Sequence, residues 1–194
     1  MLPPGSTIGI LGGGQLGRML AMAAASLGYR CIGYAPPGDI VADDVSAAFF
    51  ANQWDDAPAL ASFAAQCDVV TWEFENVPLG AVGAIPADRL APPPIALEVA
   101  QDRLEEKRFV AALGGRTAPY APVDTRAELE AAAERIGTPG ILKTRRDGYD
   151  GKGQWRIESA RDVAALPPLA SAAIYEGLLY FQRTMGIFPR CVQA

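Results

Sequence analysis

Residues 7–28 read TIGILGGGQLGRMLAMAAASLG, and this stretch decides the fold of the first part of the chain. Its first five residues are a short apolar run with β-branched side chains, which predicts a buried strand. A glycine cluster follows, and the alanine-rich segment 15–27 predicts a helix that ends at Gly28. A second apolar run, 30–34, predicts another strand. Strand, glycine turn, helix and strand in this order indicate a doubly wound α/β domain with a parallel sheet.

The remaining segments continue this alternation of strands and helices in two parts. Three prolines in a row, residues 92–94, are the clearest linker signal. We therefore predict a first domain over 1–94 and a second over 95–177. In the first domain, further strands are predicted at 46–51 and 68–72, and a further helix at 57–66. In the second domain, helices are predicted at 95–113, 125–136 and 159–166, and strands at 118–123, 141–143, 154–157 and 172–176. Thr125 and Glu128 match the capping-box pattern that starts a helix.

Composition and charge limit the classes of function. The 194 residues carry a formal net charge of −5. An acidic chain repels a phosphate polymer, so we expect no nucleic acid as a partner, whereas a small anion needs only a local positive site. Because no apolar stretch is long enough to cross a bilayer and no signal-peptide pattern is seen, we expect a cytoplasmic protein without a membrane partner. The chain has no histidine, and its three cysteines show no metal-ligand spacing.

The first glycine cluster is a candidate phosphate site. Gly12, Gly14 and Gly17 match G-x-G-x-x-G, in which bare backbone N–H groups and a helix N-terminus favour a phosphate. This pattern fits a dinucleotide site, a phosphorylated substrate, or a tight turn without a ligand. A dinucleotide site usually has an acidic residue at the end of the second strand, but here the first acid is Asp39, after two prolines. A phosphate-bearing substrate is therefore favoured over a dinucleotide.

A polar turn follows the strand predicted at 68–72. In open α/β sheets, ligands bind beyond the carboxyl ends of the strands, and Glu73, Glu75 and Asn76 lie at such an end. A carboxylate there would accept hydrogen bonds from sugar hydroxyls or an amine. The alternative is a solvated loop in which Glu75 is an ordinary surface charge.

The segment 143–154, KTRRDGYDGKGQ, is the most informative part of the second domain. It begins with Lys143 near the end of an apolar strand, and it combines three glycines with Arg145, Arg146 and Lys152. A polyphosphate is bound well by backbone N–H groups and several cations under a mobile loop that can close over it. The segment is not a Walker loop, because no G-K-[ST] precedes a helix. A β-hairpin with Asp-Gly turns is the structural alternative, and it is compatible with a phosphate lid.

Three of these motifs resemble one enzyme family. They are IGILGGGQLGRML at 8–20, TWEFENVP at 71–78 and GYDGKGQWR at 148–156; QDRL at 101–104 and IYEG at 174–177 are weaker matches. Together they resemble the 5-(carboxyamino)imidazole ribonucleotide synthases of the ATP-grasp superfamily, and the resemblance covers residues 7 to about 177. It implies a Rossmann-like pre-ATP-grasp domain that binds a ribonucleotide, followed by the first, incomplete lobe of an ATP-grasp domain.

The resemblance also implies a carbon–nitrogen ligase of purine biosynthesis. Such an enzyme uses MgATP and bicarbonate to make carboxyphosphate, and it carboxylates 5-aminoimidazole ribonucleotide with release of ADP and phosphate. The implied substrate-binding residues are Gly14, Gln15, Leu16, Glu73 and Asn76. The implied ATP-binding residues are Arg103, Lys143, Gly148, Tyr149, Asp150, Gly151, Lys152, Gly153, Gln154, Glu176, Gly177, Leu178 and Leu179. Asp150, Lys152 and Tyr149 are the implied catalytic residues, and no metal ligand is assigned.

The resemblance ends at residue 177, and residues 178–194 are divergent. Thr184 stands where the family would place a glutamate, and no motif of the second ATP-grasp lobe, which carries the Mg²⁺ ligands, is seen. A frameshift or a truncation would explain this tail, and we expect the chain alone to be inactive as an enzyme. The family suggests a homodimer. Two other functions stay open: an NAD(P)-dependent Rossmann oxidoreductase, and a non-catalytic nucleotide-binding module.

Overall fold

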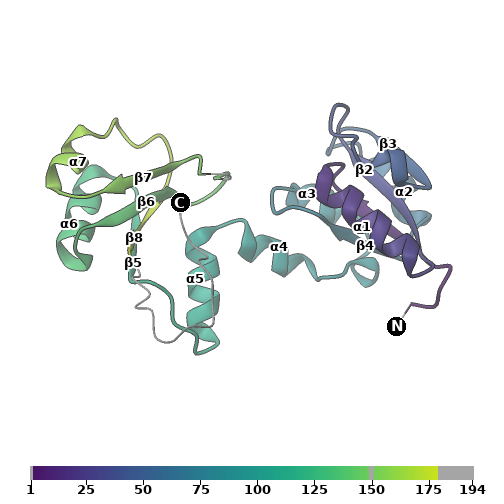
Figure 1. Ribbon diagram of the computed structural model, residues 1–194, viewed down its shortest axis with the longest axis horizontal. Helices are drawn as coiled ribbons and strands as arrows, with labels where there is room; N and C mark the ends of the chain where they lie inside the picture. Colours follow the sequence, from purple (N-terminus) through teal and green to yellow (C-terminus); the bar gives the residue numbers. More distant parts are fainter. Residues whose placement is uncertain (1, 149–150, 179–194) are drawn as a thin grey trace. The chain divides into compact units, whose positions relative to one another are not determined.

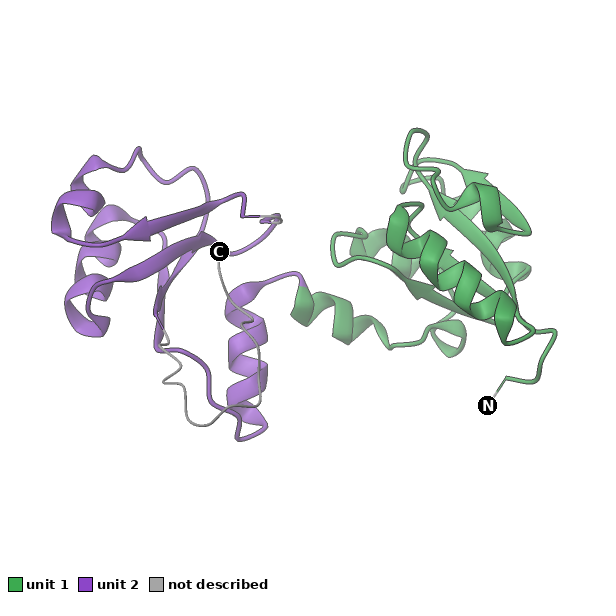
Figure 2. Cartoon of the chain, in the orientation of Figure 1, with its two compact units in different colours: residues 1–100 green, residues 101–194 purple. Residues whose placement is uncertain are grey.

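The computed structural model describes residues 2–148 and 151–178. The chain divides into two compact units, residues 1–100 and 101–194 (Figure 2). None of the helices in the described residues has the length and apolar character needed to cross a membrane.

The first unit contains a four-stranded parallel sheet. Its strands are β1 (Thr7–Leu11), β2 (Arg30–Ala35), β3 (Ala48–Ala51) and β4 (Val69–Trp72). The order across the sheet is β3-β2-β1-β4, and all three pairings are parallel. Figure 1 labels β2, β3 and β4 among the helices of this unit. The helices are α1 (Gln15–Ser26), α2 (Ala57–Ala65), α3 (Leu79–Gly83) and α4 (Pro94–Ala100), with single 3-10 turns at Asp43–Val45 and Ala87–Arg89. The predicted strand, glycine turn, helix and strand are confirmed.

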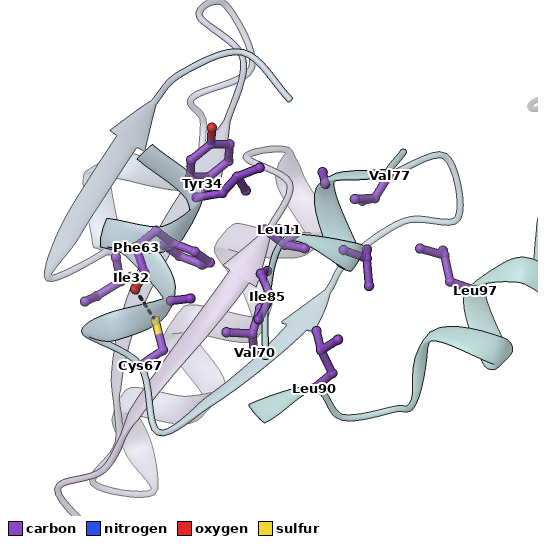
Figure 3. Close-up of a cluster of buried hydrophobic side chains, with 14 residues drawn as sticks. Leu11, Ile32, Tyr34, Phe63, Cys67, Val70, Val77, Ile85, Leu90 and Leu97 are labelled. Carbon is purple, nitrogen blue, oxygen red and sulfur yellow. Dashed lines mark hydrogen bonds between the residues drawn. The ribbon is translucent and has the colours of Figure 1, made fainter. Parts of the chain in front are cut away.

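The core of this unit lies between the sheet and its helices, as Figure 3 shows. Phe63 of α2 and Tyr34 of β2 are fully buried, with ring centroids 5.4 Å apart. The Tyr34 hydroxyl donates to the Gln53 carbonyl at 2.7 Å, so this buried polar group is satisfied. A glycine is required in β1 beneath Phe63, because a Cβ on Gly9 would lie 2.7 Å from that ring.

The second unit contains a four-stranded antiparallel sheet. Its strands are β5 (Tyr120–Val123), β6 (Gly140–Thr144), β7 (Gln154–Ile157) and β8 (Ala173–Gly177), in the order β5-β8-β6-β7. Its helices are α5 (Arg103–Ala112), α6 (Arg126–Ile136) and α7 (Ala160–Ala165). Leu142 and Tyr175 point to the face of the sheet that packs with Leu129 of α6 and Val163 of α7. Side chains alternate along a strand, so Lys143 and Glu176 lie on the other face.

The region predicted as one helical stretch, 95–113, is two helices. α4 ends at Ala100 and α5 begins at Arg103, because Asp102 acts as an N-cap and accepts a hydrogen bond from the Leu104 N–H at 2.9 Å. Leu97 of α4 is buried in the core of the first unit, which therefore extends beyond the three prolines to Ala100. The capping box of Thr125 and Glu128 at the start of α6 is confirmed.

Phe63→Ala tests the packing of the first core. Because this ring is fully buried, we expect the variant to lower the free energy of unfolding by about 3–5 kcal/mol. Phe109→Ala is the matched control, since this ring is 50% exposed and its loss should cost within about 0.5 kcal/mol. Urea unfolding followed by circular dichroism measures both, and equal losses would contradict the assigned core.

Candidate functional site

The first candidate site is the glycine turn between β1 and α1. Gly12 has a φ of +113°, a conformation that favours glycine, and its N–H donates to the Tyr34 carbonyl at 2.9 Å. A Cβ on Gly12 would lie 2.4 Å from Cγ of Glu73, and one on Gly13 would lie 1.8 Å from the carbonyl oxygen of Asp39. The turn therefore needs its glycines because two other segments approach the backbone closely.

Glu73, directly after β4, places its carboxylate on the first turn of α1. Its two oxygens accept from the Gly14 N–H at 3.0 Å and the Gly17 N–H at 3.2 Å. A carboxylate is favourable at this end of a helix, because the macrodipole and the unpaired N–H groups attract negative charge. The structure thus brings together the glycine turn and Glu73, which the sequence analysis treated as two motifs.

The N–H groups of Gln15 and Leu16 occupy the next two positions of α1. They have no intrahelical acceptor, because they lie in the first turn, and the described residues supply no acceptor for them. Both side chains are exposed. This leaves two donors for an anion at the helix end, while the Gly14 N–H is already paired with Glu73.

Two further polar residues, Asn76 and Asp39, lie in loops that follow other strands of the same sheet. Asn76 is half-buried in the loop between β4 and α3, and none of the hydrogen bonds found among the described residues joins it to the glycine turn. Asp39 was not assigned from the sequence, yet its carboxylate accepts from the Gly13 N–H at 3.3 Å. Two prolines separate Asp39 from the end of β2, where an acidic residue of a dinucleotide site would be expected. The contact between Asp39 and Gly13 therefore becomes evident only in the folded loop.

The second candidate site lies on the sheet of the second unit, on the face opposite α6 and α7. Lys143 of β6 and Glu176 of β8 form an ion pair, with Nζ 3.1 Å from Oε2. Lys107 of α5 approaches the same oxygen at 3.5 Å, and its Nζ lies 5.6 Å from the centroid of the Tyr120 ring. Lys107 was not among the predicted residues; it lies four positions after Arg103, on the same face of the helix.

The glycine loop between β6 and β7 follows Lys143 closely in the sequence and is closed at its base. The Thr144 N–H donates to the Gly153 carbonyl at 2.8 Å, and the Arg103 guanidinium donates to the Gly148 carbonyl at 2.8 Å. Gly151 and Gly153 have φ values of +79° and +68°. The predicted hairpin strands, β6 and β7, therefore pair on both sides of the described part of this loop.

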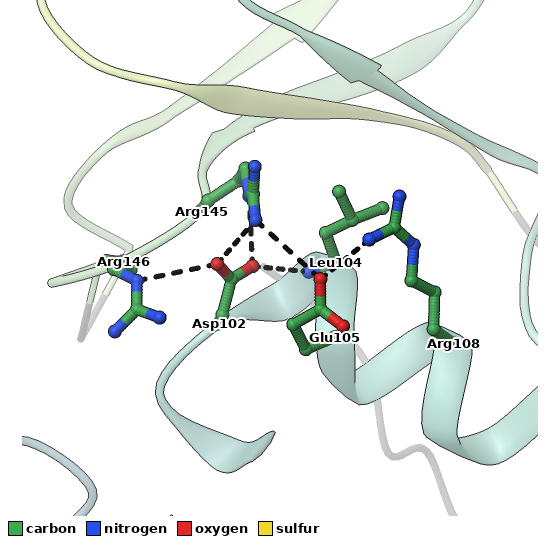
Figure 4. A network of polar contacts seen from close by, with 6 residues as sticks. All are labelled: Asp102, Leu104, Glu105, Arg108, Arg145 and Arg146. Carbon is green, nitrogen blue, oxygen red and sulfur yellow. Dashed lines mark hydrogen bonds and ion pairs between the residues drawn. The ribbon is translucent and has the colours of Figure 1, made fainter. Parts of the chain in front are cut away.

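A buried carboxylate fixes the start of this loop, as Figure 4 shows. Asp102 is 3% exposed and receives a two-pronged contact from Arg145, with Nε at 3.0 Å and Nη2 at 2.6 Å. Arg146 Nε lies 3.4 Å from the same carboxylate. Burial raises the pKa of Asp102, but the hydrogen bonds from Arg145 and Leu104, together with the two arginine charges, outweigh it and hold that pKa below its usual value.

The other predicted residues of this site lie as follows. Gln154 begins β7, Gly177 ends β8 and donates to the Pro119 carbonyl at 2.9 Å, and Leu178 is half-buried just after it. The Lys152 side chain is exposed. Tyr149, Asp150 and Leu179 lie outside the described residues.

The described residues do not fit a Mg²⁺ site. They contain no group of three carboxylate or thiol side chains that would hold a metal ion. The one carboxylate beside Lys143, that of Glu176, is already paired with two ammonium groups. A hard cation that prefers several carboxylate oxygens and waters finds no such set here.

Comparison with known protein families identifies both units. Residues 5–101, half of the chain, match the ribonucleotide synthetase preATP-grasp domain. The chain belongs to this family. Residues 108–187 match the ATP-grasp domain, so the preATP-grasp domain is followed by ATP-grasp sequence, and the predicted α/β fold class and order of domains are confirmed.

Relatives of this preATP-grasp chain are N5-carboxyaminoimidazole ribonucleotide synthases. The protein of that name from Brucella melitensis is 48% identical over 191 residues, which are 96% of this chain and 53% of the relative. The one from Staphylococcus aureus strain COL is 38% identical over 160 residues, 82% of this chain and 43% of the relative. The chain thus spans about half the length of the curated relatives it matches, and the predicted resemblance is confirmed.

Solved structures agree with these relatives. N5-carboxyaminoimidazole synthetase from Staphylococcus aureus complexed with ADP superposes with a TM-score of 0.83 at 33% identity, over 93% of this chain and 49% of that chain. The N5-carboxyaminoimidazole synthase from Aspergillus clavatus in complex with ADP and 5-aminoimidazole ribonucleotide superposes with a TM-score of 0.74 at 27% identity. The superposition covers 92% of this chain and 48% of that chain. Neither comparison favours the oxidoreductase alternative.

Asp102→Asn tests the buried carboxylate of the second unit. Removing one partner of a buried ion pair leaves Arg145 uncompensated, so we expect a loss of about 3 kcal/mol in the free energy of unfolding at pH 7. The folded pKa of Asp102 is lowered. The difference in free energy of unfolding between the wild type and Asp102→Asn is therefore complete above the pKa of about 3.9 in the unfolded state. It shrinks as the pH falls through the pKa of Asp102 in the folded state.

Urea unfolding of both proteins between pH 7 and pH 2 measures this difference. Glu158→Gln is the control, because Glu158 pairs with Arg156 on the surface and its loss should have little effect. A difference between wild type and Asp102→Asn that stays constant down to pH 2 would contradict the assigned pairing.

Proposed function

We propose that this protein takes part in the ATP-dependent carboxylation of 5-aminoimidazole ribonucleotide with bicarbonate. The products are 5-(carboxyamino)imidazole ribonucleotide, ADP and phosphate. The observation that carries the proposal is the gathering of Arg103, Lys107 and Lys143 beside a glycine loop. This loop and Lys143 lie within the part of the sequence that matches the ATP-grasp domain, residues 108–187. The relatives at 48% and 38% identity carry the name of this activity.

The first unit is proposed to bind the ribonucleotide. Its 5′-phosphate would accept hydrogen bonds from the N–H groups of Gln15 and Leu16 at the N-terminus of α1. Glu73 holds the Gly14 and Gly17 amides, so it shapes the turn and brings a carboxylate beside the phosphate site, where it would face the ribose or the base. Asn76 would complete this side of the site.

The second unit is proposed to bind the ATP phosphates. Lys143 and Arg103 supply positive charge, and residues 148–154, including Gly148, Gly151, Gly153 and Gln154, would cover the phosphates. Such cations matter because phosphoryl transfer is catalysed mainly by positioning and charge neutralisation. The backbone after β8, at Glu176, Gly177, Leu178 and Leu179, would lie beside the adenine and ribose.

The chemistry has two steps. A bicarbonate oxygen attacks the γ-phosphorus of ATP, the bond to the β-phosphate oxygen breaks, and carboxyphosphate and ADP form. The exocyclic amine of the ribonucleotide then attacks the carboxyl carbon, loses a proton, and displaces phosphate. Tyr149, Asp150 and Lys152 are proposed to lie near carboxyphosphate, and closure of the loop would protect this labile species from water.

We further propose a cytoplasmic protein that forms a homodimer and needs Mg²⁺ with ATP, but no nucleic acid or membrane.

Lys143→Met tests the nucleotide site. Loss of a charge-assisted contact to phosphate should weaken ADP binding by about 10- to 100-fold, while the affinity for 5-aminoimidazole ribonucleotide stays unchanged. Isothermal titration calorimetry with MgADP and with the ribonucleotide measures both. ADP affinity equal to that of the wild type would show that Lys143 does not contact the phosphates.

Glu73→Ala tests the ribonucleotide site in the same assay. Without the carboxylate that pairs with the Gly14 and Gly17 amides, the turn loses its shape, and we expect ribonucleotide binding to fall by at least about tenfold with ADP binding retained. Glu75→Ala is the control, since Glu75 is exposed in the same loop. Tight binding of NAD⁺ to the wild type without ribonucleotide binding would instead support the oxidoreductase alternative.

A further inference from the structure

Two lysines share one carboxylate in the second unit. Oε2 of Glu176 lies 3.1 Å from Nζ of Lys143 and 3.5 Å from Nζ of Lys107. All three side chains are largely shielded, with exposed fractions of 12% for Glu176, 14% for Lys107 and 20% for Lys143. Two ammonium groups and one carboxylate leave a net charge of +1 at this point, on the face that carries the proposed nucleotide site.

The shared oxygen limits what Lys143 can do alone. If Lys143 turns from Glu176 to a phosphate, a carboxylate that is 12% exposed loses its nearest counter-ion. A shielded charge without a partner is costly, so that movement would be opposed. Lys107 removes this obstacle, because its ammonium group already lies near the same oxygen and can remain there.

The position of Lys107 is set by neighbouring contacts. The helix that carries it is joined to the glycine loop through the Arg103 N–H, which donates to the Arg145 carbonyl at 3.0 Å. Lys107 itself lies over the Tyr120 ring, whose face attracts a cation. Lys107 is therefore held on the Glu176 side of the site, whereas Lys143 is the penultimate residue of β6, close to the glycine loop.

We propose that Lys107 is the residue that neutralises Glu176 when Lys143 turns to the phosphates of a bound nucleoside di- or triphosphate. Lys107 is thus a positioning residue that acts through Glu176 and does not touch the nucleotide. The proposal deepens the proposed function and rests on it, because it requires that a nucleotide phosphate binds at Lys143.

The first test needs no nucleotide. Urea unfolding is compared for Lys107→Met, Lys143→Met and the double variant. Each single variant leaves one lysine beside Glu176, so each should shift the unfolding midpoint only slightly, and the double variant should shift it by more than the sum. Adding Glu176→Gln to the double variant should recover most of the loss. Additive shifts would overturn the shared neutralisation of Glu176.

The second test measures ADP binding by titration calorimetry. Lys107→Met should weaken MgADP binding by about tenfold, and Lys107→Arg should restore it, because either cation neutralises Glu176. Arg108→Met is the matched control, since it removes a charge from the same helix at a surface pair with Glu105. In a Glu176→Gln background, Lys107→Met should have no further effect.

The outcomes separate this inference from the proposed function. Wild-type protein that fails to bind MgADP overturns both. Wild-type binding with Lys107→Met equal to Arg108→Met overturns the inference alone. A loss caused by Lys107→Met that persists in the Glu176→Gln background also overturns it, because Lys107 would then act on the nucleotide directly.

Discussion

A buried ion pair, Asp102 with Arg145, determines how the second unit presents its cations. The Asp102 carboxylate caps α5 through the Leu104 N–H and holds the Arg145 guanidinium at the end of β6. The first turn of a helix and the start of the glycine loop are thereby fixed to each other. Arg103 and Lys107 follow on one face of α5, so their reach toward the Gly148 carbonyl and Glu176 depends on this one carboxylate. Because the pair is buried, its geometry matters more for the site than its net contribution to stability.

The first unit uses a carboxylate in a comparable way. Glu73 bonds two of the N–H groups at the start of α1 and leaves those of Gln15 and Leu16 to an anion. In both units a carboxylate thus satisfies part of a helix N-terminus and holds a glycine-rich segment in place. Glu73 comes from a distant segment, whereas Asp102 directly precedes the helix that it caps. The two phosphate sites proposed here differ in their remaining donors. The first offers backbone amides, and the second offers lysine and arginine side chains.

Much of this could be predicted from the sequence, and particular residues show why the rest could not. The β1–α1 turn was predictable because its glycines and the alanine-rich helix are local signals, and the capping box of Thr125 and Glu128 is local too. The break between α4 and α5 was missed because helical periodicity continues across it, although Asp102 is of a residue type that favours the N-cap position. Lys107 and Asp39 were missed because their roles depend on partners distant in the chain, Glu176 and Gly13. Nothing in their own surroundings marks them.

Hydrogen exchange followed by mass spectrometry, with ADP and 5-aminoimidazole ribonucleotide added separately, tests the central claim most directly. The claim is that each unit holds its own phosphate-bearing ligand at its own glycine-rich segment. The account predicts that MgADP slows exchange in residues 143–154 and that the ribonucleotide slows exchange in residues 12–17 and 73–76. Protection of residues 12–17 by ADP, with no change in residues 143–154, would contradict it.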